Sequence, residues 1–108
     1  RDEGVLVVGS GNIVHNLRHW KPNQAEPYDW AQRFDEDIAD RIAEGHHEGM
    51  LGYETLGPDA LMAIPSPEHY LPLLYVLALQ RDEDPVEFFN EDVVGPISMR
   101  SVIIGKLD

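Results

Sequence analysis

The feature that most constrains the fold is a short apolar run, residues 5–8, which ends in the turn Gly9-Ser10-Gly11. The run is Val-Leu-Val-Val without an intervening polar residue, a pattern typical of a strand covered on both faces of a sheet. Residues 12–20 that follow the turn are compatible with a helix. This order predicts that the chain leaves a buried sheet through a tight turn, in the region where α/β sheets usually bind ligands.

Farther along, the sequence predicts an amphipathic helix over residues 29–44, which Gly45 is expected to end. Its apolar side chains recur every four positions, with charged residues between them: Trp30, Phe34, Ile38 and Ile42. Residues 45–58 are dotted with glycine and are predicted to form a loop with at most one helical turn.

Two further helices are predicted after this loop. Pro58 can open a short helix that reaches Ala63, because proline suits a first helical turn. Ser66 is expected to act as the N-cap of a helix that extends to about Gln80. Pro72 lacks an N–H group, so we expect a bend in the first turns of that helix.

The C-terminal third favours strands, at residues 86–89 and 97–104. Strands with intervening helices indicate an α/β fold, a mixed sheet with flanking helices. The sequence starts with Arg1 rather than methionine and reaches its first strand-like run almost at once. We therefore expect residues 1–108 to be a fragment of a longer protein, with an incomplete α/β domain.

Composition excludes several classes of partner. The chain has 20 acidic and 8 basic residues, and a formal charge of −12 opposes binding to nucleic acid. No apolar run approaches the roughly 18 residues that a membrane span needs, so no membrane association is expected. Cysteine is absent, which rules out disulfides, thiolate zinc sites and cysteine nucleophiles within these residues and fits a cytoplasmic location.

His15 is a candidate functional residue because it lies just after the glycine turn. Asn12 lies three residues before it and would share its face on a helix. A nucleotide-binding loop is disfavoured, since the third glycine of the dinucleotide fingerprint is replaced by Val14. Position alone leaves two readings open: a hydrogen-bonded structural histidine and a catalytic one.

His69 is the second candidate. It falls in the first turn of a predicted helix, where the positive end of the helix dipole disfavours the imidazolium form and leaves a lone pair available for a metal. The alternative is a capped helix start, in which Glu68 complements the dipole and Tyr70 packs inward.

The other histidines are weaker candidates. His15 and His19 are four residues apart and could bind a metal from one face of a helix, but Asn16 stands where the metalloprotease motif has a glutamate. His19 is therefore expected to be exposed. The adjacent His46 and His47 could bind a divalent ion loosely, but adjacent loop residues rarely converge on one ion, so a solvated polar loop is favoured.

Two long segments surround the two candidate histidines. They read Ser-Gly-Asn-Ile-Val-His-Asn-Leu around His15 and Pro-Ser-Pro-Glu-His-Tyr-Leu-Pro-Leu-Leu-Tyr around His69. Both resemble hallmark segments of the DODA-type, class III extradiol ring-cleaving dioxygenases, the family of DOPA extradiol dioxygenase. Residues 51–58 and 97–102 are similar to family segments too, so the likeness covers nearly the whole chain and corresponds to the family's C-terminal portion.

The resemblance implies roles for individual residues. His15 would be the acid/base beside the metal, and His69 would be one ligand of a non-haem Fe(II), with Zn(II) able to occupy the same site. Some relatives use a glutamate as a ligand, which leaves Glu68 as the alternative metal ligand. Asn12 and Asn16 could orient His15 or the substrate, although a helix-capping role for Asn12 is an equal alternative.

The implied reaction is insertion of both atoms of O₂ into a catechol, such as DOPA, next to its two hydroxyl groups, which gives a ring-opened semialdehyde. The remaining metal ligands would come from the family's N-terminal portion, so these 108 residues alone are expected to be inactive. Two alternatives from other classes are a non-catalytic α/β module that binds metal weakly and a metal-dependent hydrolase. The lack of a carboxylate-rich cluster counts against the hydrolase.

Overall fold

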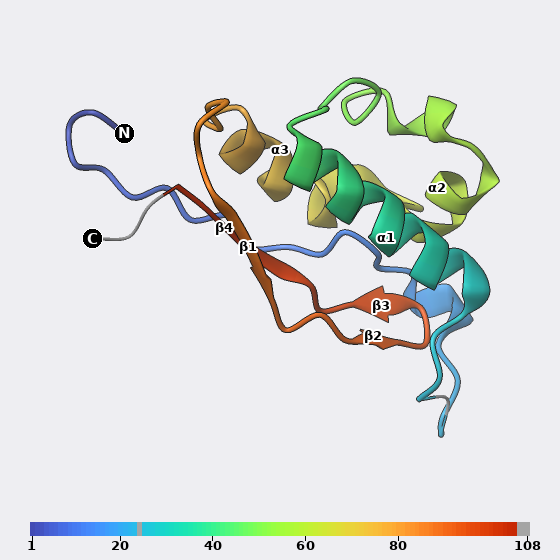
Figure 1. The fold of residues 1–108 in the computed structure, drawn as a ribbon. Coiled ribbons are helices and arrows are strands. Elements are labelled where there is room, and N and C mark those ends of the chain that lie inside the picture. Colours follow the sequence, from blue (N-terminus) through green and yellow to red (C-terminus); the bar gives the residue numbers. More distant parts are fainter. Residues whose placement is uncertain (24, 106–108) are drawn as a thin grey trace.

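A computed structural model describes residues 1–23 and 25–105 (Figure 1). The predicted domain, residues 1–108, therefore includes residue 24 and residues 106–108, which lie outside the described part. The described helices and strands are Asp29–Glu44 (α1), Pro58–Ala63 (α2), Leu71–Leu77 (α3), Val86–Phe89 (β1), Val93–Val94 (β2), Ile97–Ser98 (β3) and Ser101–Ile104 (β4). Short 3-10 turns form at Leu17–His19, Tyr53–Leu56 and Pro67–His69. The predicted α/β class is confirmed.

The longest helix, α1, has the bounds that its periodicity predicts. Phe34, Ile38 and Ile42 are buried at the centre of the core. Gly45 ends the helix in the left-handed conformation, with φ of 71°, and its N–H group donates to the carbonyls of Arg41 and Ile42. Its bounds follow from local features, a strong apolar stripe and a glycine stop.

The strands form two antiparallel pairs. β1 pairs with β4, with Val86 opposite Ile104 and Phe89 opposite Ser101. β2 pairs with β3. The predicted strand at 86–89 is confirmed, whereas the one at 97–104 is interrupted at residues 99–100, where the chain changes from pairing with β2 to pairing with β1.

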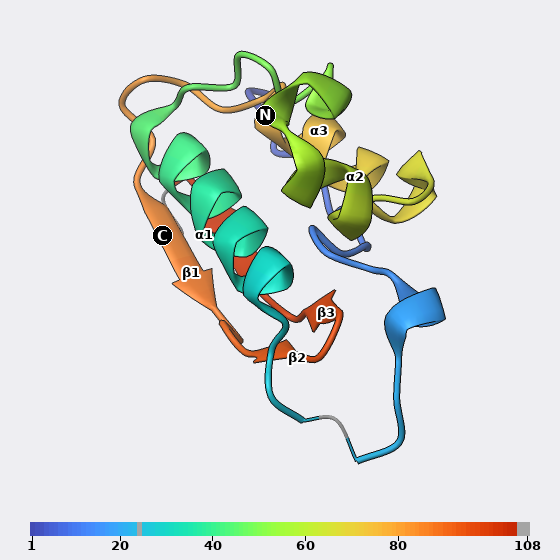
Figure 2. The ribbon, with the colours of Figure 1, turned by 90° about the vertical axis from the view of Figure 1, so that its right-hand side faces the viewer.

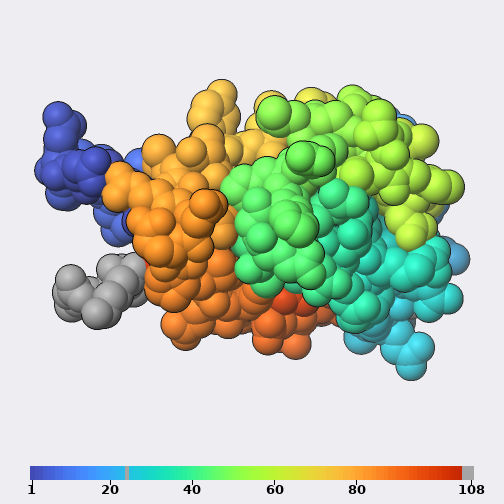
Figure 3. All heavy atoms as spheres, turned by 45° about the horizontal axis from the view of Figure 1, so that its top comes forward, coloured from blue at the N-terminus to red at the C-terminus, as the bar shows by residue number. Residues whose placement is uncertain are grey.

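α1 lies across the hairpins and contacts β2, β3 and α2 (Figures 1 and 2). In Figure 2, β1 lies on one side of α1, and α2 and α3 lie on the other side. The first residues of the chain, in blue, project from one end of the body (Figure 3). None of the described helices is long and apolar enough to cross a membrane.

The strand predicted at residues 5–8 does not form. These residues have no regular structure and are exposed, with Leu6 and Val8 each 78% accessible. A strand needs a neighbour for its backbone hydrogen bonds, and none of the described strands pairs with this run. The run instead passes beside α3, where a side chain at Gly9 would meet the Pro72 carbonyl oxygen.

The helix predicted over residues 12–20 is also wrong, apart from the 3-10 turn Leu17–His19. The residues before that turn are drawn into contacts with distant segments. Asn16 donates its N–H to the Pro96 carbonyl, and Val14 accepts from the N–H of Ser98. Because these backbone groups are hydrogen-bonded to Pro96 and Ser98, they cannot form the hydrogen bonds of a helical turn.

The helix predicted from Ser66 to about Gln80 is broken near its start, in the region where Pro72 was expected to bend it. A 3-10 turn, Pro67–His69, precedes α3, and α3 ends at Leu77. The expected cap is absent, because the Ser66 hydroxyl donates to the Glu68 carboxylate instead. The short helix from Pro58 to Ala63 is confirmed.

Candidate functional site

The two candidate histidines lie in contact, although 54 positions separate them in the sequence. The imidazole rings of His15 and His69 are stacked, with centroids 3.7 Å apart and planes inclined by 21°. Both side chains are half-buried. The fold therefore brings together the two residues on which the functional prediction depends.

His15 is held by its main chain from two sides. Its N–H group donates to the carbonyl of Ala63 at 3.0 Å, and it forms an isolated antiparallel bridge with Ile97. On either side of it, Val14 and Asn16 hydrogen-bond to the chain around β3. The backbone is extended here, which fixes the direction in which the imidazole leaves the chain.

His69 lies at the junction between the 3-10 turn Pro67–His69 and α3. Its carbonyl accepts the N–H of Asn12 at 2.6 Å. The next residue, Tyr70, is buried and donates its hydroxyl to the Met50 carbonyl at 2.9 Å. A Cβ atom at Gly11 would clash with the His69 carbonyl oxygen. The glycine turn is therefore needed for a close approach between two backbones.

The two asparagines hold main-chain segments together. The side-chain amide of Asn12 donates to the Ser98 carbonyl at 2.8 Å. Asn16 is buried, and its amide donates to the Met62 carbonyl at 2.7 Å. The Asn16 Oδ1 atom has no hydrogen-bond partner among the described residues. Whether either side chain also orients a substrate stays a prediction.

Glu68, the alternative metal ligand, is exposed. Its Oε1 atom accepts the Ser66 hydroxyl at 2.6 Å. This hydrogen bond, followed by one from its own backbone N–H, lowers the pKa of the Glu68 carboxyl group below its usual value. His15 and His69 also contribute to the lowering.

Burial lowers the pKa of the His15 imidazole from its usual value of 6.5, and the neighbouring His69 lowers it further. Burial removes water from the charged form of His15, and a positive charge on the adjacent His69 ring repels that form. The lowered pKa favours the neutral imidazole of His15, which has a lone pair that can accept a proton.

The described residues do not by themselves fit a held metal ion. They contain no group of three histidine or carboxylate side chains that could bind one. His69 has the right chemistry for one ligand, but a catalytic metal ordinarily has three protein ligands. His46 pairs with the Glu44 carboxylate at 3.2 Å, and His47 hydrogen-bonds Gln80 at 2.6 Å, so these two histidines do not converge.

A cavity of about 430 Å³ opens beside His69. Its walls are mainly apolar and come from residues 6–8, α3 and the hairpin of β1 and β4. Asn12 and Arg100 add polar groups to the lining. The cavity is large enough for a small aromatic ligand and lies next to one of the two histidines.

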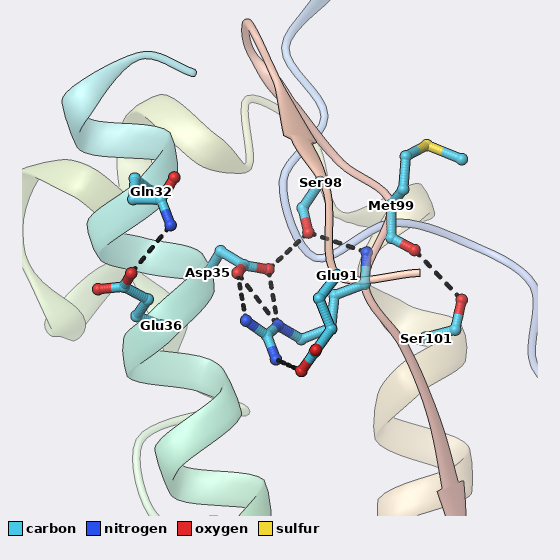
Figure 4. A network of polar contacts seen from close by, with 8 residues as sticks. Gln32, Asp35, Glu36, Glu91, Ser98, Met99 and Ser101 are labelled. Atoms are coloured by element: carbon cyan, nitrogen blue, oxygen red, sulfur yellow. Dashed lines mark hydrogen bonds and ion pairs between the residues drawn. The ribbon is translucent and has the colours of Figure 1, made fainter. Parts of the chain in front are cut away.

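A cluster of charged side chains that the sequence did not predict surrounds Ser98 (Figure 4). Asp35 on α1 is fully buried, accepts the Ser98 hydroxyl at 2.5 Å and forms an ion pair with Arg100 at 2.8 Å. Arg100 also reaches Glu91 at 3.0 Å. One signal was available: Asp35 stands three residues before Ile38, on the apolar face of the predicted helix.

Comparison with known proteins assigns the family. Residues 1–99 match the family model described as the catalytic LigB subunit of aromatic ring-opening dioxygenase. The chain therefore belongs to the LigB family. This confirms the resemblance to extradiol dioxygenases that the two histidine segments indicate.

Individual relatives agree with this assignment. The "4,5-DOPA dioxygenase extradiol" of Escherichia coli K12 is 40% identical over 97% of the chain, and that of Beta vulgaris is 31% identical over 90%. The chain spans 40% and 36% of the length of these two relatives. A crystal structure of an uncharacterized Escherichia coli K12 protein superposes with a TM-score of 0.80 at 36% identity, covering 94% of this chain and 43% of that one.

Proposed function

We propose that this chain contributes His15 and His69 to the active site of an extradiol dioxygenase, which opens the ring of a DOPA-like catechol with O₂ and releases a ring-opened semialdehyde. The observation that carries the proposal is the contact between the two imidazoles in a chain of the LigB family. Relatives that bear the name "4,5-DOPA dioxygenase extradiol" support the substrate class.

In this proposal His15 is the acid/base. Its lowered pKa favours the neutral imidazole, which can accept the proton of a catechol hydroxyl group and return a proton later in the reaction. The extended backbone around His15 supports the role, because it holds the ring in one direction without a conformational change.

His69 is the proposed metal ligand, with Glu68 as the alternative. The metal would be Fe(II), or Zn(II) in the same site, and when bound it would bring the catechol and oxygen side by side. Since the described residues offer fewer than three converging donors, we propose that the other ligands lie outside this chain.

The cavity beside His69 is the proposed substrate pocket. Its apolar walls suit an aromatic ring, and Asn12, which lines the cavity, is the residue proposed to orient a hydroxyl group of the substrate. Asn16 does not line the cavity, and its proposed part in orienting groups would be indirect, through His15 beside it. A cytoplasmic location remains a prediction from the absence of cysteine.

The test measures oxygen uptake and the absorbance of the ring-opened product, with Fe(II) and a panel of catechols, in a protein that joins this chain to the remaining ligands. We expect His69→Ala to abolish metal retention. His15→Ala should retain the metal and lower kcat by about 10²-fold or more, the usual effect of losing an acid/base group. His19→Ala, at an exposed histidine, is the matched control and should leave both unchanged.

Two results would contradict the proposal. If the iron-loaded protein takes up no oxygen with any catechol, the dioxygenase assignment is wrong. If His15→Ala loses the metal while His69→Ala keeps it, the two roles are reversed.

A non-catalytic α/β module is the second candidate for the 108 residues taken alone. The lack of three converging metal donors among the described residues favours it for the isolated chain. Nothing in the described residues favours a metal-dependent hydrolase.

A further inference from the structure

Both histidines are connected by hydrogen bonds to the same short strand, β3, His15 by its own segment and His69 through Asn12. His15 forms its bridge with Ile97, and the neighbouring Val14 accepts the N–H of Ser98 at 3.0 Å. His69 reaches β3 through Asn12, whose N–H donates to the His69 carbonyl and whose side-chain amide donates to the Ser98 carbonyl. The position of Ser98 therefore influences both imidazoles.

Asp35 attaches this strand to α1. Its carboxylate accepts the Ser98 hydroxyl at 2.5 Å and receives three hydrogen bonds from Arg100, at 2.8 to 3.1 Å (Figure 4). The backbone N–H of Arg100 in turn donates to the Ser98 hydroxyl oxygen at 3.2 Å. Asp35 is fully buried, whereas Asp37 on the same helix is partly exposed and pairs with Arg41.

Stability alone does not explain a carboxylate at this point of the core. Burying an ion pair costs desolvation, and replacing such a pair by apolar side chains of similar volume is often neutral or stabilising. Position 35 lies on the apolar face of α1, where a leucine would fit the pattern of Phe34, Ile38 and Ile42. The carboxylate fixes the position of the Ser98 hydroxyl group, because charge-assisted hydrogen bonds are strong and short.

We propose that Asp35 is a positioning residue, which acts through Ser98 and Asn12 to set the separation and tilt of the His15 and His69 rings. The functional importance of this geometry rests on the function proposed above. The geometry itself is measurable in the chain without metal, substrate or turnover, so the two proposals can fail separately.

The test uses nuclear Overhauser cross-peaks between the ring protons of His15 and His69 in the 108-residue chain. Wild type should show them, since the centroids are 3.7 Å apart. Ser98→Ala removes the hydroxyl that Asp35 holds and should weaken or abolish the cross-peaks while the protein stays folded. Ser101→Ala is the matched control and should leave the cross-peaks unchanged, because the Ser101 hydroxyl donates, among the described residues, to the nearby Met99 carbonyl alone.

A second variant separates positioning from stability. Asp35→Leu combined with Arg100→Met replaces the buried carboxylate and the partly buried guanidinium by apolar groups. We expect this variant to stay folded by circular dichroism but to lose the cross-peaks. Cross-peaks at wild-type intensity in either folded variant would overturn the proposal. Unfolding of Ser98→Ala or of the double variant would also overturn it, because the cluster would then serve stability. Loss of the cross-peaks without any ring cleavage in the wild-type enzyme would refute only the proposed function.

Discussion

The contact between His15 and His69 depends on a small residue that carries no chemistry of its own. Gly11 passes so close to the His69 carbonyl that its missing side chain is a requirement of the packing. The next residue, Asn12, uses this proximity to donate its N–H to the same carbonyl. Close backbone approach is thus the physical role of the glycine turn, rather than the phosphate binding that such turns often provide.

We predict that Gly11→Ala destabilises the chain by about 1–3 kcal/mol, the usual cost of inserting a methyl group into a packed site. It should also weaken the ring contact between the two histidines, because the segment around His69 must move away. Urea unfolding measures the first effect and proton NMR the second. Gly52→Ala is the control, since a Cβ atom there meets nothing within 4 Å and φ is −96°. Equal stability of both variants would show that the close approach is not required.

Among the elements, α1 organises the molecule. It packs against α2, β2 and β3 through its buried face, and that face also carries Asp35. On its outer side, Arg33 forms a bidentate ion pair with Asp59 at the start of α2, with distances of 2.8 and 2.9 Å. This hydrogen-bonded guanidinium lowers the pKa of the Asp59 carboxyl group below its usual value of 3.8.

The ion pair between α1 and α2 predicts a pH dependence of stability. A carboxyl group whose pKa is lower in the folded state stabilises that state above its unfolded pKa, and the contribution is lost as the pH falls through the folded pKa. Asp59→Asn should therefore be slightly less stable than wild type at pH 6, and the two should converge as the pH decreases below about 3.8. The difference should be small, because both side chains are partly exposed and solvent screens them.

The measurement is the urea midpoint of each protein at pH values from about 2.5 to 6, a range that includes the usual pKa values of carboxyl groups. Arg33→Met should show the same convergence, since it removes the other partner. A difference between wild type and Asp59→Asn that stays constant down to the lowest pH would show that this ion pair does not contribute.

At the scale of the whole molecule, the described residues form a packed core and also leave large apolar side chains exposed. Leu6 and Val8 are each 78% accessible and lie at a cavity that extends to His69. The proposed metal ligand therefore lies beside an apolar surface that the described residues leave open. Contiguous apolar surface of this kind favours association of the isolated chain.

We predict that the 108-residue chain alone binds Fe(II) or Zn(II) weakly and cleaves no catechol. His69, assisted by Glu68, supplies fewer donors than the three that ordinarily hold a catalytic metal. Calorimetric titration with Zn(II), anaerobic titration with Fe(II) and oxygen uptake with DOPA measure the three quantities. His69→Ala should remove the weak binding. Tight binding of one ion, or turnover by the chain alone, would show that another donor, such as His46 or His47, completes the site.

The sequence by itself determined the features that arise from local interactions. The four-residue spacing of apolar side chains and Gly45 defined α1, and Pro58 marked the start of α2. The sequence also indicated the family, because the two long segments around His15 and His69 resemble segments of the extradiol dioxygenases. Side-chain periodicity, helix stops and continuous motifs are properties of neighbouring residues, so they can be read without knowing the fold.

Only the tertiary structure decided which distant segments meet. Residues 5–8 look like a buried strand, but a strand forms only where another lies beside it, and none of the described strands pairs with them. His15 stacks on His69, and the Asp35 carboxylate accepts the Ser98 hydroxyl. Both contacts result from backbone and side-chain hydrogen bonds between segments far apart in the chain. No local pattern specifies such contacts, because their free energy depends on how the whole core packs.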